Sequence, residues 1–99
     1  MQHPYCDFLG WVGPAVRPGL AGEAVVSAIM AENKPVVILE GELLIRILVE
    51  GRCSVKYAII GKFLGRKFAQ LSDLQAIMPT YRGVLLATQE EVVWLPISI

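Results

Sequence analysis

The sequence VKYAIIGKFL at residues 55–64 decides the predicted fold, because its apolar side chains can alternate between two faces of an extended chain. Side chains two residues apart lie on the same face of a β-strand. One face of this strand would carry Tyr57, Ile59, Gly61 and Phe63. A glycine inside a strand often marks a bulge or the close approach of another backbone, and Gly61 fits that role. We therefore predict a strand over residues 55–64.

The residues after this stretch predict one helix and two strands. Ser72 is a suitable N-cap for a short helix that Pro79 would end. The stretches 83–87 and 92–97 are apolar and branched, as strands are, and residues 88–91 would form the turn between them. The second half of the chain is thus predicted to run β-α-β-β.

The residues before this stretch supply a helix and at least one strand. Residues 23–32 carry apolar side chains at helical spacing, and Asn33 and Pro35 would end that helix. The run VVIL at 36–39 is short, branched and apolar, which indicates a buried strand. Residues 42–50 fit one face of a helix and an extended strand equally well.

These elements together predict an α+β fold, a two-layer sandwich of ferredoxin-like type. Glycine and proline recur through residues 1–22, too often for a helix or a central strand, so we predict an N-terminal arm there and a single α+β domain at 23–99. Tyr5, Phe8 and Trp11 could clamp the arm to the domain or pack opportunistically.

Composition limits the function further. The chain has 99 residues, the length of one domain, and its 55% hydrophobic and 18% charged residues exclude a disordered chain. The cysteines Cys6 and Cys53 and the single His3 are too few to supply the four ligands of a zinc site, so we expect no metal and no cofactor. No set of reactive groups forms a catalytic site, and we expect a protein that is not an enzyme.

The location of the protein is predicted from what interrupts its apolar stretches. Asp7, Arg17 and the prolines break any signal peptide in residues 1–22, and every charge-free run is shorter than the roughly 18 apolar residues that a membrane-spanning helix needs. We expect an intracellular protein, nuclear or cytoplasmic, without a membrane partner.

Basic side chains cluster in the middle of the chain. Residues 51–70 contain no acidic residue, and their cations are Arg52, Lys56, Lys62, Arg66 and Lys67. Cations pair with phosphates, and bases stack on aromatic rings, here Tyr57 and Phe63. These seven residues predict weak binding of single-stranded RNA or DNA, and the alternative is an ordinary solvated face with core aromatics.

A second candidate surface lies at the C-terminus. The run VVWLPISI at 92–99 contains Trp94 and no charge, so it could be an edge strand that pairs with another chain, for example in a homodimer. Pro96 favours an edge position, although the same fold could also cover this strand. The alternative function is therefore a protein-interaction or self-association module.

The motif from Tyr57 to Arg66, followed by residues 71–77 and by Gly83-Val84, resembles a plant domain of unknown function. That family occurs in retrotransposon-derived proteins, commonly ahead of a CCHC zinc knuckle, and the resemblance covers about residues 34–97. It implies a nucleic-acid-associated, ferredoxin-like or RRM-like domain without agreed catalytic residues. Ile99 comes before a second helix and a fourth strand of the family, so the resemblance implies an incomplete sheet unless residues 23–50 complete it.

Overall fold

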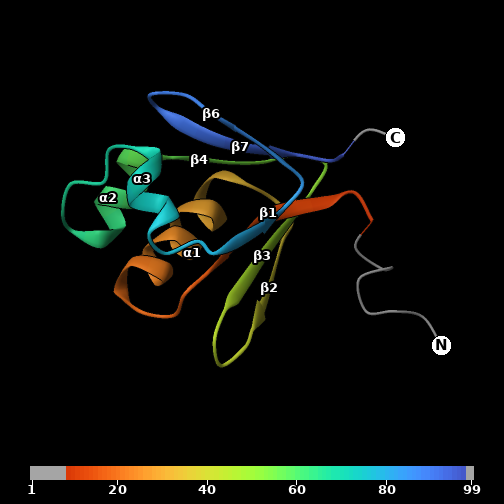
Figure 1. Cartoon of the computed structure of the whole chain (residues 1–99), viewed down its shortest axis with the longest axis horizontal. Helices are drawn as coiled ribbons and strands as arrows, with labels where there is room; N and C mark the ends of the chain where they lie inside the picture. The colour runs from red at the N-terminus through yellow and green to blue at the C-terminus, as the bar shows by residue number, and fades with distance from the viewer. Residues whose placement is uncertain (1–8, 98–99) are drawn as a thin grey trace.

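The computed structural model of the protein describes residues 9–97. Three helices gather to one side of seven strands, which confirms the predicted α+β class (Figure 1). In chain order the elements are β1 (Trp11–Val16), α1 (Leu20–Glu32), β2 (Val36–Glu40), β3 (Ile45–Glu50), β4 (Cys53–Lys56), α2 (Tyr57–Leu64), α3 (Leu71–Gln75), β5 (Thr80–Arg82), β6 (Val84–Ala87) and β7 (Glu91–Leu95).

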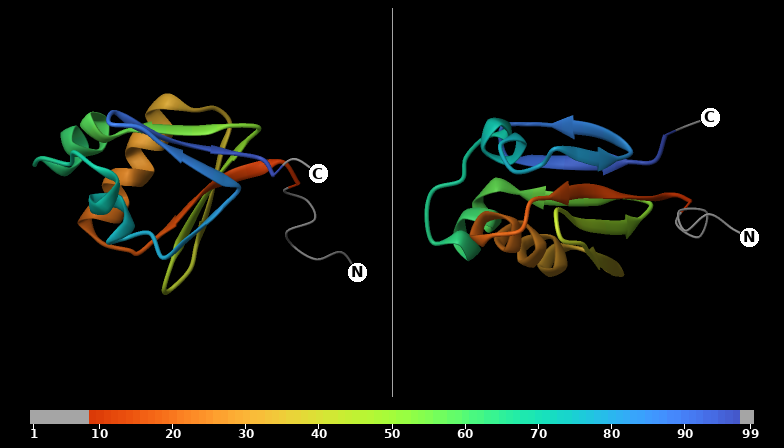
Figure 2. Two further views of the ribbon diagram at one scale, coloured as in Figure 1. Left: turned by 45° about the horizontal axis from the view of Figure 1, so that its top comes forward. Right: turned by 60° about the horizontal axis from the view of Figure 1, so that its bottom comes forward.

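The strands form two antiparallel sheets where the ferredoxin-like prediction expected one. The first has the order β2-β3-β1-β5 and the second the order β4-β7-β6. The sheets separate at Gly83, because β5 pairs with β1 whereas β6 pairs with β7. Figure 2 shows this chain segment, in blue, passing from one sheet to the other.

One hydrophobic core joins both sheets and all three helices. Its largest fully buried side chains include Ile29 of α1, Ile47 of β3, Ile60 of α2, Leu74 of α3 and Trp94 of β7. Burying an aliphatic side chain of this size stabilises a fold by about 1.5–3 kcal/mol. The core therefore holds the three helices against both sheets.

A central strand, β1, lies within the segment predicted to be an arm, so the expectation that residues 1–22 hold no central strand is wrong. Gly13 and Pro14 caused the error. A Cβ on Gly13 would overlap the carbonyl oxygen of Ile47, so glycine lets β1 approach β3. The ladder to β3 skips Gly13 and Pro14, which has no N–H to donate. Tyr5 and Phe8, the other clamp candidates, lie outside the described residues.

Residues 57–64 form the helix α2, so the predicted strand is wrong beyond Lys56. Tyr57, Ile60 and Leu64 lie at helical spacing and face the core, while the intervening Lys62 is exposed. The helix ends at Gly65, whose φ of 80° is a left-handed conformation typical of a glycine that ends a helix. Over eight residues, the two-residue period of a strand and the longer period of a helix cannot be told apart.

The remaining predicted elements are close to those observed. The helix predicted from Glu23 begins three residues earlier, and the strand at 36–39 is β2. Residues 42–50, which fitted two structures, contain the strand β3. The short helix α3 has Gln70 at its N-cap where Ser72 was predicted. The last two predicted strands are β6 and β7.

Candidate interaction surface

The predicted basic strip is divided among four structural elements. Arg52 lies between β3 and β4, where its Nη1 donates to the Ser54 hydroxyl at 3.5 Å. Lys56 ends β4, Lys62 and Phe63 lie on α2, and Arg66 and Lys67 lie on the loop that follows α2. Four of the seven predicted residues line one pocket: Lys56, Tyr57, Arg66 and Lys67.

The two predicted stacking rings do not form one surface. Tyr57 is 2% exposed, and its ring packs against Phe68 with ring centroids 6.4 Å apart. Phe63 is 52% exposed on another side of α2. Residues six positions apart share a face on a strand but not on a helix, which explains why the strand prediction placed these rings together.

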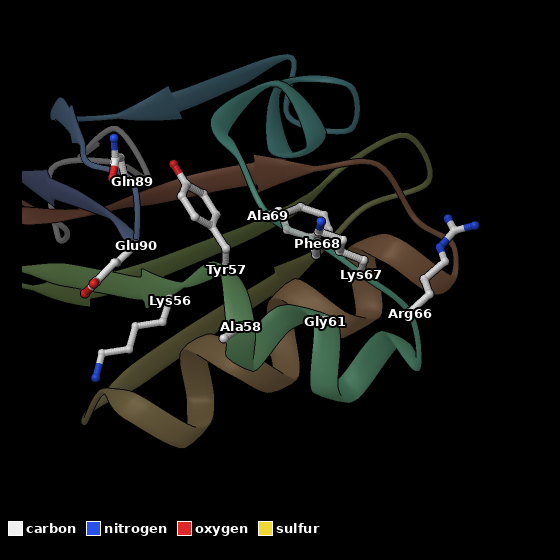
Figure 3. Close-up of a pocket in the computed structure, with 10 residues that line it drawn as sticks. All are labelled: Lys56, Tyr57, Ala58, Gly61, Arg66, Lys67, Phe68, Ala69, Gln89 and Glu90. Carbon is white, nitrogen blue, oxygen red and sulfur yellow. The ribbon is translucent and has the colours of Figure 1, made fainter.

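The pocket beside α2 has a volume of about 540 Å³. Figure 3 shows the rings of Tyr57 and Phe68 in its middle, with Glu90 toward one end and Arg66 toward the other. The β6–β7 turn forms one wall, which is held in place because the Tyr57 N–H donates to the Glu90 carbonyl oxygen at 3.1 Å. Ala69 and Gln89 also line the pocket, and the sequence carried no functional signal for either.

Within residues 9–97, the buried Tyr57 hydroxyl has no hydrogen-bond partner. Burial raises the pKa of this phenol, because the charged form would lose its hydration. The hydroxyl therefore stays protonated at neutral pH and does not act as a base.

The outer edge of β4 is closed by a side chain. Asn33 ends α1, and its Oδ1 accepts a hydrogen bond from the Ser54 N–H at 3.1 Å. Its Nδ2 donates to the carbonyl oxygens of Ser54 and Ile29, each at 2.8 Å. The amide thus takes the place of a neighbouring strand, so β4 does not offer these groups to another chain.

Residues 80–87 form an apolar outer edge. β5 is the last strand of one sheet and β6 the last strand of the other, so this segment lies outermost in both. Tyr81, Val84 and Leu86 are 45%, 44% and 51% exposed. Proteins usually protect such edges with charges, yet Arg82 is the single charged residue of this segment and residues 83–89 carry none. We call residues 80–87 the docking edge.

Trp94 is not on an edge. β7 lies between β4 and β6, and Trp94 is fully buried there, so the predicted homodimer through this strand is wrong. The prediction failed because the position of this strand depends on the strand order. An apolar strand with no charge fits the centre of a sheet as well as its edge. Pro96 lies just after the strand, where it interrupts no pairing.

The described residues give no support for metal or thiol chemistry. Among residues 9–97, no three histidine, cysteine, aspartate or glutamate side chains lie together as metal ligands, while His3 and Cys6 lie outside this range. Burial raises the pKa of the Cys53 thiol to about 12, against an opposing effect of Arg52, so it is not a nucleophile at neutral pH. No helix in the described part of the chain is long and apolar enough to span a membrane.

Comparison with known proteins identifies a different family from the one that the sequence motif suggested. The sequence model of the MmoB/DmpM family matches residues 11–95. The chain is 33% identical over 85 residues to the effector subunit of the alkene monooxygenase system of Xanthobacter autotrophicus, covering 84% of this chain and 83% of that protein.

A solved structure shares the fold. A chain in the structure of a phenol hydroxylase–regulatory protein complex aligns with a TM-score of 0.76, covering 86% of this chain and 97% of its own length. The two are 15% identical, so this likeness concerns the fold alone.

These matches overturn the resemblance to a plant retrotransposon-derived domain. That resemblance depended on the short motif from Tyr57 to Arg66, which forms a helix here and not the strand that the motif implies. The family match extends over both sheets, including β1, which the resemblance left out. The interpretation as a nucleic-acid-binding domain with a single-stranded RNA or DNA partner is therefore wrong.

Proposed function

The chain belongs to the MmoB/DmpM family, and on that basis we propose that it is the effector component that binds and modulates the hydroxylase of a multicomponent monooxygenase. The observation that carries this proposal is the 33% identity to an effector subunit over 84% of the chain. Effector proteins of this family are non-catalytic, which confirms the prediction that the chain is not an enzyme.

We infer the class of substrate from the same relative. That protein belongs to an alkene monooxygenase system, so the hydroxylase partner of this chain is expected to oxidise an alkene. The chain itself would contact the hydroxylase and not the alkene.

The effector would act through binding energy. A protein without catalytic groups changes the rate of another only by binding two of its states with different affinity. In this proposal the chain binds the active state of the hydroxylase more tightly and raises its population. A tenfold shift in that population requires about 1.4 kcal/mol of differential binding.

The docking edge is the surface that we assign to the hydroxylase. It combines exposed apolar side chains with the unpaired outer side of β5 and β6. A partner segment that covers both would gain affinity and would be fixed in its register along the strand. The edge of β4 is unsuitable because Asn33 occupies it. The alternative function predicted from the sequence, a protein-interaction module, is thus kept with a different strand as its edge.

A titration of alkene turnover tests the proposal. The purified hydroxylase and its electron-transfer components are supplied with an alkene, and oxygenated product is measured as this chain is added. The proposal expects the rate to rise severalfold and to saturate near one chain per hydroxylase active site. An unchanged rate, together with no complex in sedimentation, would refute it.

A further inference from the structure

The pocket beside α2 directly continues the docking edge. β6 ends at Ala87, and Gln89 and Glu90 of the next turn line the pocket. A partner segment along β6 would therefore reach the pocket within two or three residues. The backbone hydrogen bond between Tyr57 and Glu90 keeps this wall against α2.

Two adjacent cations give the pocket a local positive charge. Arg66 and Lys67 are exposed, and within residues 9–97 neither forms an ion pair. Asp73 lines a neighbouring groove with them, but its Oδ2 already accepts hydrogen bonds from the Ala69 and Gln70 N–H groups at 3.0 and 3.2 Å. These two cations therefore lack a partner of opposite charge.

The third cation of the pocket, Lys56, has an acidic residue opposite it in the sheet. Lys56 in β4 lies opposite Glu91 in β7, and opposite charges at such positions attract. The acidic Glu90 stands at the same end of the pocket (Figure 3). The excess positive charge is therefore at the other end, beside Arg66 and Lys67.

Apart from Gln89, the rest of the pocket is lined by apolar and aromatic residues. Its lining includes the Tyr57 and Phe68 rings and the small residues Ala58, Gly61 and Ala69. Pockets that hold ligands commonly measure about 300–1,000 Å³ and combine an apolar lining with a few polar groups, as this one does. An aliphatic side chain that ends in a carboxylate fits both the apolar lining and the positively charged end of the pocket.

We propose that this pocket receives an aspartate or glutamate side chain that the hydroxylase presents next to the segment lying along β6. This inference rests on the proposed function. The methylene groups pack against the exposed apolar lining residues Ala58 and Ala69, and the carboxylate pairs with Arg66 and Lys67. A guanidinium can bind a carboxylate through two parallel hydrogen bonds, which gives this contact direction as well as charge.

The affinity of the whole chain for the hydroxylase tests this pairing. We expect the double variant Arg66→Ala/Lys67→Ala to bind about fivefold more weakly, the sum of two modest ion pairs, and to depend less on salt. The matched control is Lys62→Ala, which removes an exposed cation of the same basic run that does not line the pocket. Its affinity should stay within about twofold of the original.

A second variant tests entry into the pocket without changing charge. Ala69→Leu adds bulk at an exposed lining position and should also weaken binding about fivefold, while the slope of affinity against salt stays as in the original chain. Circular dichroism melting checks that each variant folds.

The outcomes separate the two proposals. If the original chain binds the hydroxylase but the double variant or Ala69→Leu binds equally well, the pocket proposal is overturned and the proposed function stands. Equal losses for Lys62→Ala and the double variant would also overturn it, because general charge would then explain the effect. If the original chain does not bind at all, the proposed function itself fails.

Discussion

A Cβ on Gly83 would lie 2.6 Å from the carbonyl oxygen of Leu95, closer than real Cβ atoms approach an oxygen. Gly83 also has a φ of +107°, which side-chain-bearing residues rarely adopt. It stands between β5 and β6, where the chain leaves one sheet and enters the other. The contact with Leu95 therefore sets how closely the docking edge lies against β7.

We expect Gly83→Ala to destabilise the fold by about 3 kcal/mol, because the methyl group meets the Leu95 backbone and the Val12 side chain and the φ angle becomes strained. Urea denaturation measures this change. Gly51→Ala is the matched control, since Gly51 has a φ of +79° but no atom within 4 Å of an added Cβ. It should cost about 1 kcal/mol. Equal costs would mean that the close approach to Leu95 and Val12 has no effect.

The Asn33 side chain should contribute strongly to stability. In Asn33→Ala the Ser54 N–H and carbonyl groups lose their partner at the edge of β4, which should cost about 2 kcal/mol in the free energy of unfolding. Asn33→Asp keeps an oxygen acceptor for the Ser54 N–H. Its free energy of unfolding should therefore lie between those of the original chain and Asn33→Ala. Hydrogen exchange at the Ser54 amide should accelerate in Asn33→Ala, and an unchanged rate would contradict this role.

Substitutions in the docking edge should leave the stability of the free chain nearly unchanged but weaken its binding to the hydroxylase. Leu86→Lys places a charge on the outer strand, so we expect hydroxylase affinity to fall at least tenfold, or about 1.4 kcal/mol, with little change in thermal stability. Leu39→Lys on β2, the outer strand at the opposite end of the first sheet, is the matched control and should bind normally. A similar loss of affinity for both variants would show that the hydroxylase does not prefer the docking edge to the β2 edge.

Stability should decline in alkaline solution because of Cys53. Its pKa is raised to about 12 in the folded protein from an ordinary value of 9.0, chiefly by burial. Above pH 9 the unfolded chain releases this proton and the folded one does not, so the free energy of unfolding should fall as the pH rises from 9 toward 12. Cys53→Ala should flatten this decline, and an identical pH profile would contradict the assignment.

The sequence could predict structure where local signals agree. The strand β2 and the strands of the C-terminal hairpin are marked by short branched runs between breaks, and α1 by its helical spacing. For α2, a two-residue period and a helical period both fit Tyr57 to Leu64, and only packing of Tyr57 and Ile60 against the core decides between them. Gly65 was the available signal for a helix end.

Other features depend on contacts between distant residues. Gly13 and Pro14 are strand breakers locally, yet the approach of Ile47 makes glycine necessary in β1. The charge run identified Arg66 and Lys67, but the β6–β7 turn, which completes their pocket, is far away in sequence. Strand order, which buries Trp94 and exposes Leu86, has no local signature in either strand.

Hydrogen exchange of the whole chain, alone and with its hydroxylase, is the most direct test of docking through residues 80–87, because it reports which backbone amides the partner covers. We expect slower exchange at residues 80–87 and around the pocket at 66–69, with β2 unchanged as the internal control. Protection confined to β2, or no protection at hydroxylase concentrations that saturate turnover, would contradict docking through this edge.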